Sequence, residues 1–479
     1  MNYSIILYIV GWILNFQAVF MALPCVTALI YRERSGFAFL ITMAVCVFIG
    51  LPLVRKKPSN KVFHTKEGYV TVALSWIVLS ITGAIPFVIS GSIPHPVDAV
   101  FETVSGFTTT GASILSSVEA LPRCVLMWRS FTHWIGGMGV LVFLLCLLPL
   151  TGGYHMNLMR AESPGPTVSK LVPKVQSTAK ILYTIYLALT LLEIFLLLLG
   201  GMPVFDTLCT AFGTAGTGGF GIKNDSIAGY STYIQVVVTI FMILFGVNFS
   251  AYYLILTKKF VQAFKIEEVR WYLGIIAVST LVITYNIRPM FNGIGTALKH
   301  AAFQVGSIIT TTGFATTDFN QWPGVSRTIL VMLMFVGACA GSTGGGIKVS
   351  RFIILTKAIG KELHLYLHPN AVKKVKMDQK TVAHEVIRST NTFISVYVLI
   401  FAVSTLIIAF DNFDLVTNFT AVAATLNNIG PGLELVGPTG NFGLFSPLSK
   451  CVLIFDMLAG RLEIFPLLLI FVKDTWKKF

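Results

Sequence analysis

Long apolar runs separated by short polar segments occupy most of this 479-residue chain. Residues 181–199 and 393–410 are long enough for membrane-spanning helices, which take about 20 mostly apolar residues. Residues 234–256 and 451–472 are interpreted as continuous spans by the same criterion. The pattern predicts an all-α integral membrane protein, because a helix satisfies all of its backbone hydrogen bonds within one segment.

Four short polar turns interrupt this apolar pattern. In chain order they are Thr109-Thr110-Gly111, Thr217-Gly218-Gly219, Thr311-Thr312-Gly313 and Asn428-Ile429-Gly430. Their last glycines are 108, 94 and 117 residues apart, which is enough for a helical hairpin and its return. About 10–16 mostly apolar residues precede each turn, too few for a span and suitable for a half-helix. A single such stretch would be an ordinary loop, whereas four in register indicate an internal repeat.

The repeat divides the chain into five parts. Residues 1–54 are expected to form a two-helix hairpin, and the pore units are expected at 68–150, 179–257, 269–360 and 388–475. Each unit is predicted to hold a spanning helix, a half-helix with its turn, and a second spanning helix. Irregular backbone at membrane depth must face protein or water. The four units are therefore predicted to surround one pore with pseudo-fourfold symmetry.

The composition of the turns suits a cation filter. Backbone carbonyls can replace the hydration shell of an ion, and glycine permits the positive φ that aims them at one axis. Threonine adds a hydroxyl that can bind the ion or hold the turn. The half-helices would also direct their negative carboxyl ends toward the pore, which favours a cation there. We predict that the twelve turn residues bind the transported ion.

Charge and composition agree with a protein embedded in lipid. Only 12% of the residues are charged and the mean hydropathy is +0.78, whereas soluble proteins carry about a quarter charged residues. The formal net charge is +14, and most of the lysines and arginines lie in segments 55–67, 152–180, 257–270, 348–388 and 473–479. The positive-inside rule assigns these segments to the cytoplasm, so no nucleic acid partner is needed to explain the charge. The seven scattered cysteines fit buried small hydrophobes.

A second unusual stretch is Gly341-Ser342-Thr343-Gly344-Gly345-Gly346, inside the second helix of the third unit. Each glycine costs a helix interior about 1 kcal/mol relative to alanine, so we predict a loop that faces the pore. The alternative is a glycine-rich helix-packing face. The stretch resembles a phosphate-binding loop but has Ile347 where lysine is required. The glycines at 216, 218 and 221 match the G-x-G-x-x-G pattern of dinucleotide-binding folds but lack its βαβ context. No enzyme and no organic cofactor are predicted.

Arg461 lies inside the apolar run 452–472, where an arginine costs roughly 2.5–3.5 kcal/mol on insertion scales. At about 10 Å from a passing ion, with an effective dielectric constant of about 20, it would oppose that ion by roughly 1.7 kcal/mol. That energy slows permeation without sealing a pore, so Arg461 is expected to assist the glycine loop as a barrier. The alternative is a structural ion pair with Asp456 or Glu463.

Four further polar residues are expected at the membrane surfaces. Lys348 and Arg351 begin the cytoplasmic end of the third unit's second helix and are predicted to extend toward the lipid headgroups. His133 and Trp134 are predicted to be interfacial anchors near the outer face.

The motifs resemble those of a known superfamily. They are GFTTTGAS at 106–113, TAGTGGFGI at 214–222, TTTGFATTDF at 310–319, GACAGSTGGGIK at 337–348, NNIGPGLELVGPTG at 427–440 and GRLEIF at 460–465. The chain resembles the Trk/Ktr/HKT superfamily of potassium and sodium transport proteins over nearly its whole length, and most of all the bacterial TrkH-type subunits. Some members that pass sodium have serine at the first filter glycine, and this chain has Gly111 there.

The resemblance implies a multi-pass protein of a prokaryotic inner membrane that binds K⁺ in its filter and uses the glycine loop as an intramembrane gate. It also implies a homodimer and a cytosolic TrkA-like RCK partner, which would bind the nucleotide. The favoured function is gated, selective K⁺ uptake driven by voltage. The alternatives are K⁺ symport with H⁺ or Na⁺, for which Glu193 is the obvious mid-span carboxylate, and a scaffold without transport.

Overall fold

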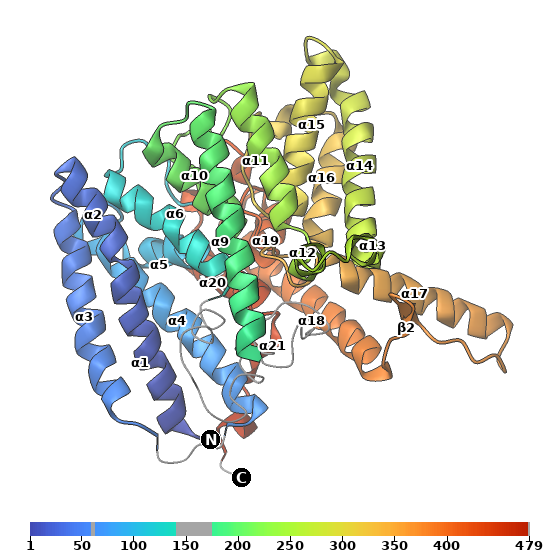
Figure 1. Cartoon of the computed structure of the whole chain (residues 1–479), viewed down its shortest axis with the longest axis horizontal. Helices are drawn as coiled ribbons and strands as arrows, with labels where there is room; N and C mark the ends of the chain where they lie inside the picture. Colours follow the sequence, from blue (N-terminus) through green and yellow to red (C-terminus); the bar gives the residue numbers. More distant parts are fainter. Residues whose placement is uncertain (59–62, 140–174, 478–479) are drawn as a thin grey trace.

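The computed structural model describes residues 1–58, 63–139 and 175–477, which form an almost entirely helical molecule (Figure 1). The chain begins with α1 (Tyr3–Phe20), α2 (Ala22–Tyr31) and α3 (Gly36–Arg55). α1 and α2 together make a 29-residue apolar span, and α3 packs antiparallel beside α1. The predicted amino-terminal hairpin is therefore present at one edge of the molecule.

The first helix of each pore unit is long and unbroken. These helices are α4 (Thr65–Ile89), α9 (Val175–Leu199), α14 (Glu267–Ile287) and α18 (His384–Ile408). With the two amino-terminal spans they make six helices of the described chain that are long and apolar enough to cross a membrane.

A short pore helix follows in each unit, as predicted. The four are α5 (Pro96–Phe107), α10 (Val204–Gly216), α15 (Ile294–Ile309) and α19 (Leu415–Leu426), and each ends at one of the polar turns. With 12 to 16 residues at 1.5 Å per residue, they reach only part of the way across a bilayer.

The second helices are short or broken. They are α6 (Arg123–Gly137), α11 (Thr232–Phe245) with α12 (Phe249–Leu256), α16 (Gly324–Val336) with α17 (Val349–Leu367), and α20 (Pro447–Arg461) with α21 (Phe465–Leu469). The prediction of continuous spans at 234–256 and 451–472 is wrong. α11 and α12 meet at 93°, and α20 stops where Glu463 and Ile464 adopt positive φ. Residues 140–150, which the sequence assigns to the first unit, lie outside the described residues.

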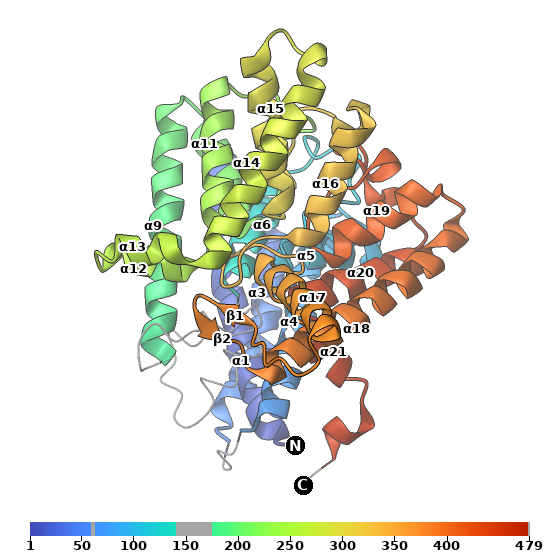
Figure 2. The same cartoon turned by 90° about the vertical axis from the view of Figure 1, so that its right-hand side faces the viewer.

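The remaining elements are small. α13 (Phe260–Lys265) follows α12, and the strands β1 (Lys376–Met377) and β2 (Lys380–Thr381) pair as an antiparallel hairpin after α17. Figure 2 shows this hairpin beside α17. Six 3-10 turns complete the described structure: Arg288–Met290, Phe319–Gln321, Ala409–Asp411, Glu434–Val436, Phe442–Leu444 and Lys473–Trp476.

The four units close into a ring through one repeated contact. The second helix of each unit packs against the pore helix of the next unit: α6 against α10, α11 against α15, α16 against α19, and α20 against α5. The last contact joins the end of the chain to its first pore helix and so closes the circle. This arrangement confirms the predicted all-α fold with four units around one axis.

Candidate ion pathway

The four polar turns share one backbone conformation. In each turn the first and the last residue lie in the left-handed region, and the middle residue does not. The first residues have φ of 54–59° and are Thr109, Thr217, Thr311 and Asn428. The last residues have φ of 75–99° and are Gly111, Gly219, Gly313 and Gly430. Asn is among the few residues enriched in this region, which explains how it replaces threonine in the fourth turn.

The turns also end their pore helices with the same hydrogen bonds. The N–H of each middle residue donates to the carbonyl five residues earlier at 2.8–2.9 Å: Thr110 to Ser105, Gly218 to Gly213, Thr312 to Ser307, and Ile429 to Ala424. This six-to-one bond is the helix-ending geometry that a left-handed residue permits. The local sequence therefore builds the same turn four times.

The turn glycines interlock in a closed circle. The Cα of Gly111 lies against the carbonyl of Gly218, Gly219 against Thr312, Gly313 against Ile429, and Gly430 against Thr110. A Cβ on any of the first three would overlap with the neighbouring carbonyl oxygen, and one on Gly430 would lie 2.8 Å from it. Only glycine fits at these positions. A cavity of about 200 Å³ opens beside the four glycines, so the predicted filter residues gather at one place.

His133 supports the first two turns from behind, and its prediction as an interfacial anchor is wrong. Its side chain is completely buried because α6 packs between two pore helices. Its Nε2 accepts from the N–H of Phe220 at 3.2 Å, so the proton lies on Nδ1, which donates to the carbonyl of Gly106 at 2.8 Å. Trp134 stacks on Tyr186 and donates its ring N–H to Thr190 Oγ1 at 3.3 Å.

A buried ion pair holds the segments that follow the same two turns. Arg129 of α6 donates to the carboxylate of Glu102 of α5 at 2.6 and 2.8 Å, and both side chains are at most 2% exposed. Glu102 also accepts from Ser113 and from the N–H of Ile114, while Arg129 donates to the carbonyl of Gly221. The pair therefore links the pore helix α5 to the segments that follow the first and the second turn.

The glycine-rich stretch is an extended loop between α16 and α17, not a helix-packing face. Residues 337–348 are non-helical, with positive φ at Gly337, Gly341, Gly346 and Lys348. The loop lies directly against the third turn, because the N–H of Gly345 donates to Thr311 Oγ1 at 2.6 Å. Because the sequence predicts a gate here, residues 337–348 are called the gate loop.

Arg461, the last residue of α20, joins the gate loop to the first unit. Its guanidinium donates to the carbonyl of Thr343 at 3.0 Å, to that of Gly137 at 2.8 Å, and to that of Gly136. Of the two carboxylates considered as its partners, Asp456 accepts from Ser404 at 2.7 Å and Glu463 pairs with Arg351. The arginine therefore lies on the gate loop, where the sequence places it.

Lys348 and Arg351 do not extend toward the lipid headgroups as predicted. Lys348 is 2% exposed and donates to the carbonyl of Gly344, because its φ of 84° turns the chain back onto the gate loop. Arg351 donates to the carbonyl of Ile347, pairs with Glu463 and lies 4.0 Å from the centre of the Phe393 ring. The side chains of Lys348, Arg351 and Arg461 thus all donate to backbone carbonyls of the gate loop.

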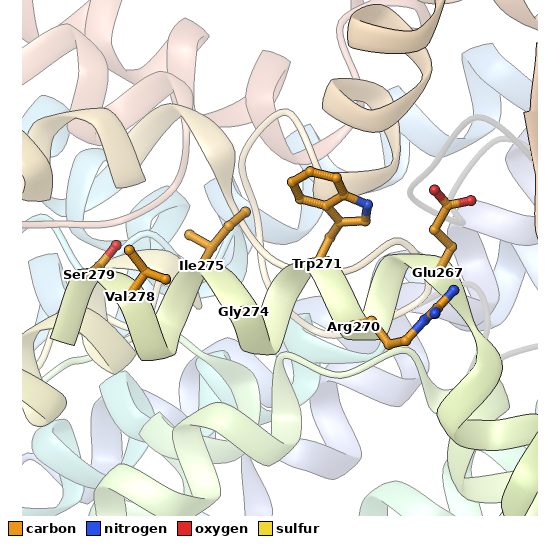
Figure 3. Close-up of a pocket in the computed structure, with 7 residues that line it drawn as sticks. All are labelled: Glu267, Arg270, Trp271, Gly274, Ile275, Val278 and Ser279. Carbon is orange, nitrogen blue, oxygen red and sulfur yellow. The ribbon is translucent and has the colours of Figure 1, made fainter. Parts of the chain in front are cut away.

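Two further features were missed or left open. Glu102 and Arg129 are opposite charges in two consecutive apolar elements, a signal that could have predicted their pairing. Glu193 of α9 is completely buried, and neither of its oxygens has a hydrogen-bond partner among the described residues. A cavity of about 740 Å³ along the start of α14 contains none of the predicted site residues (Figure 3).

Together these features define a multi-pass helical membrane protein with four pore units around a single ring of backbone carbonyls. A family model described as TrkH, cation transport protein, matches residues 35–290 and 292–478, and the chain belongs to this family.

Relatives and a solved structure agree over the full length. The chain is 38% identical to the Trk system potassium uptake protein TrkH of Salmonella typhimurium and 36% identical to that of Escherichia coli, in both cases covering 100% of each chain. It superposes on the crystal structure of the potassium transporter TrkH from Vibrio parahaemolyticus with a TM-score of 0.89, at 33% identity and 100% coverage of both chains. It is therefore a bacterial-type multi-pass membrane protein.

Proposed function

We propose that this protein takes up K⁺ across the bacterial cytoplasmic membrane by gated, selective conduction. The observation that carries the proposal is the closed ring in which each turn glycine lies against a carbonyl of the next turn. Such a ring supplies fixed oxygen ligands in place of water around a cation. The carboxyl ends of four pore helices at the ring add negative potential for K⁺. The relatives' names, which specify potassium uptake, support the choice of ion.

The barrier in this proposal is the gate loop with Arg461. The contact of Gly345 with Thr311 of the third turn supports a position of the loop on the path that an ion leaving the filter would take. Arg461 adds positive charge at the same level and fastens the loop to α6. Opening requires the loop to move away from the filter, which breaks these hydrogen bonds together with those that the loop makes to Phe245, Gly246 and Glu268.

The proposed assembly is a homodimer in the membrane with a cytosolic TrkA-like RCK partner that binds nucleotide. Support for a cytosolic partner comes from residues 348–388, which contain nine lysines and arginines and the exposed end of α17. Conformational strain applied to α17 would reach the gate loop directly, since α17 begins at Val349 where the loop ends.

The decisive experiment is cation flux into liposomes under an imposed voltage, with K⁺, Rb⁺, Na⁺ and Li⁺ tested separately and no proton gradient. Wild-type protein is expected to pass K⁺, and Gly313→Ser is expected to lose selectivity because its side chain meets the carbonyl of Ile429. Gly324→Ser is the matched control, since Gly324 has open space around its Cα. Equal Na⁺ and K⁺ flux in the wild type would refute selective conduction.

A second candidate function, K⁺ symport with H⁺ or Na⁺, is favoured by one observation. Glu193 is a buried carboxyl whose oxygens have no hydrogen-bond partner within the described residues, and such groups inside a membrane often carry protons. Symport predicts that flux in the same liposomes appears only with a proton or sodium gradient, and that Glu193→Gln abolishes it. Conduction predicts voltage-driven flux that Glu193→Gln leaves unchanged.

A further inference from the structure

The first turn of α14 touches both the gate loop and the cytoplasmic hairpin β1–β2. Its two neighbouring glutamates point to different partners. Glu268 is 3% exposed and faces the interior, whereas the Glu267 side chain is 18% exposed and lies at the helix start, as Figure 3 shows. Neither residue belongs to the predicted filter or gate.

Glu268 holds both ends of the glycine-rich stretch. Its Oε1 accepts from the N–H of Ala340 at 2.7 Å and from the N–H of Ser350 at 3.1 Å. Ala340 directly precedes the six glycine-rich residues, and Ser350 lies in the first turn of α17. One carboxylate oxygen therefore bridges two backbone positions ten residues apart. Its Oε2 accepts from Asn248, whose neighbour Phe249 donates its N–H to the carbonyl of Gly341.

Glu267 holds the cytoplasmic side. Its Oε1 accepts from Lys357 of α17 at 2.5 Å, and its own N–H donates to Asp378 at 2.7 Å. Asp378 is in the turn of the β hairpin, and Lys357 also donates to the carbonyl of Lys376 in β1 at 2.8 Å. The hairpin is further anchored by Met377, which packs on the apolar cluster that contains Cys339 of the gate loop and Val349 of α17.

We propose that Glu268 is a positioning residue that holds the gate loop closed, and that the β hairpin acts on the loop through the first turn of α14. This inference rests on the proposed function of the gate loop. Hydrogen bonds from N–H groups to a carboxylate are about twice as strong as neutral ones. Two such bonds to one oxygen fix the distance between Ala340 and Ser350. A movement of the hairpin would move Glu267 and therefore the adjacent Glu268, which would release both backbone positions together.

The structural test is hydrogen–deuterium exchange on the full-length protein in lipid nanodiscs. Glu268→Ala is expected to speed amide exchange in peptides covering 338–351 by tenfold or more, because the amides of Ala340 and Ser350 lose their acceptor. Glu268→Gln, which keeps the size of the side chain, is expected to show a smaller increase. The control is Glu362→Ala, since that glutamate is 62% exposed in its ion pair with Lys361.

The coupling test uses the hairpin. Asp378→Ala lies in a surface turn and leaves the membrane core untouched, so it is expected to fold and to speed exchange in 338–351 about threefold. Voltage-driven K⁺ flux should rise in parallel for Glu268→Gln and Asp378→Ala, while the K⁺ to Na⁺ flux ratio remains that of the wild type.

The outcomes separate this inference from the function on which it rests. Unchanged exchange in 338–351 for both Glu268 variants would overturn the positioning role, and a response to Glu268→Gln without one to Asp378→Ala would overturn the coupling. Neither result depends on transport. If deletion of Gly344–Gly346 left flux normal, the gate itself would fail even where the exchange data agreed.

Discussion

The ring of four turns, which is the proposed filter, and the layer that holds the gate loop and Arg461 are built by opposite rules. The ring repeats one turn four times, with left-handed residues at the same two positions and the same helix-ending hydrogen bond in each turn. The layer beneath uses each unit differently: the third unit gives the gate loop, the fourth gives Arg461, and the first gives the carbonyls of Gly136 and Gly137. Within the described residues no second glycine-rich loop corresponds to the one at 337–348.

The proposed function gives the two layers different tasks, and these tasks account for the difference. Surrounding a spherical ion evenly requires equivalent oxygens on all sides, so symmetry favours selectivity. A barrier needs only one element that can move, and four moving loops would each have to release the filter. The single gate loop bonds to the third turn through Gly345 and Thr311, and Gly345 also lies against Asn428 of the fourth turn.

The largest effect is expected from breaking the ring at Gly219. Gly219→Ala places a Cβ against the carbonyl of Thr312, so K⁺ flux should fall at least a hundredfold in the liposome assay. The matched control is Gly201→Ala, which has nearly the same φ (76° against 75°) but open space around its Cα. The control bears only the backbone strain of roughly 1–2 kcal/mol and should conduct. Equal loss in both variants would show that strain, and not ring closure, sets the requirement.

The support of the ring is tested by removing one partner of its buried ion pair. Arg129→Met leaves the carboxylate of Glu102 buried and unpaired, which typically costs about 3–5 kcal/mol. We expect a large fall in the thermal unfolding temperature. The control is Arg327→Met, whose ion pair with Glu434 is 35% and 46% exposed and should be worth about 0–1 kcal/mol. Similar shifts for the two variants would contradict a special role for the buried pair.

The asymmetric layer is tested at Arg461. Arg461→Ala removes a charge that opposes K⁺ by roughly 1.7 kcal/mol and also frees the gate loop from α6, so voltage-driven flux should rise more than tenfold. The K⁺ to Na⁺ ratio should not change, because the ring is untouched. Arg461→Lys keeps the charge and is expected to stay near the wild-type flux. Altered selectivity in Arg461→Ala would mean that the two layers are not independent.

The sequence predicts the symmetric layer better than the asymmetric one, and the reason is physical. Each turn is coded locally, by a half-helix and a glycine that must adopt positive φ, so a reader of the chain can find it. Beside the break between α11 and α12, which Asn248 marks as the N-cap of α12, Tyr272 donates its hydroxyl to the carbonyl of Ile243 and lies against Gly246. That tyrosine is distant in the sequence, and its partner is a backbone atom, so no pattern indicates it.

Buried polar residues show the same limit. The residue types of Lys348, Arg351 and His133 and their places near helix ends predict surface positions, because such residues usually reach water. In the folded protein each binds a backbone carbonyl of the gate loop or of the last turn of a pore helix: Gly344, Ile347 and Gly106. Irregular backbone creates unpaired carbonyls, and these attract donors that a continuous helix would have left at its end.

The smallest effect is expected at the start of α19, because the four pore helices begin differently although they end in the same turn. Among the four pore helices only α19 has a side-chain N-cap: Asp414 accepts from the N–H of Thr417 at 2.9 Å and from its hydroxyl at 2.5 Å. These bonds, first that of the hydroxyl and then that of the amide, lower the pKa of Asp414 below its usual value. The stability that they give is therefore complete above the unfolded pKa of about 3.9 and is lost as the pH falls through the lower folded pKa.

Asp414→Ala should cost about 1 kcal/mol at pH 7. Asp414→Asn should keep most of the cap and lose this acid sensitivity, as thermal unfolding at pH 7 and at pH 3 would reveal. An equal response of Asp414→Asn and wild type to acid would place the titration elsewhere.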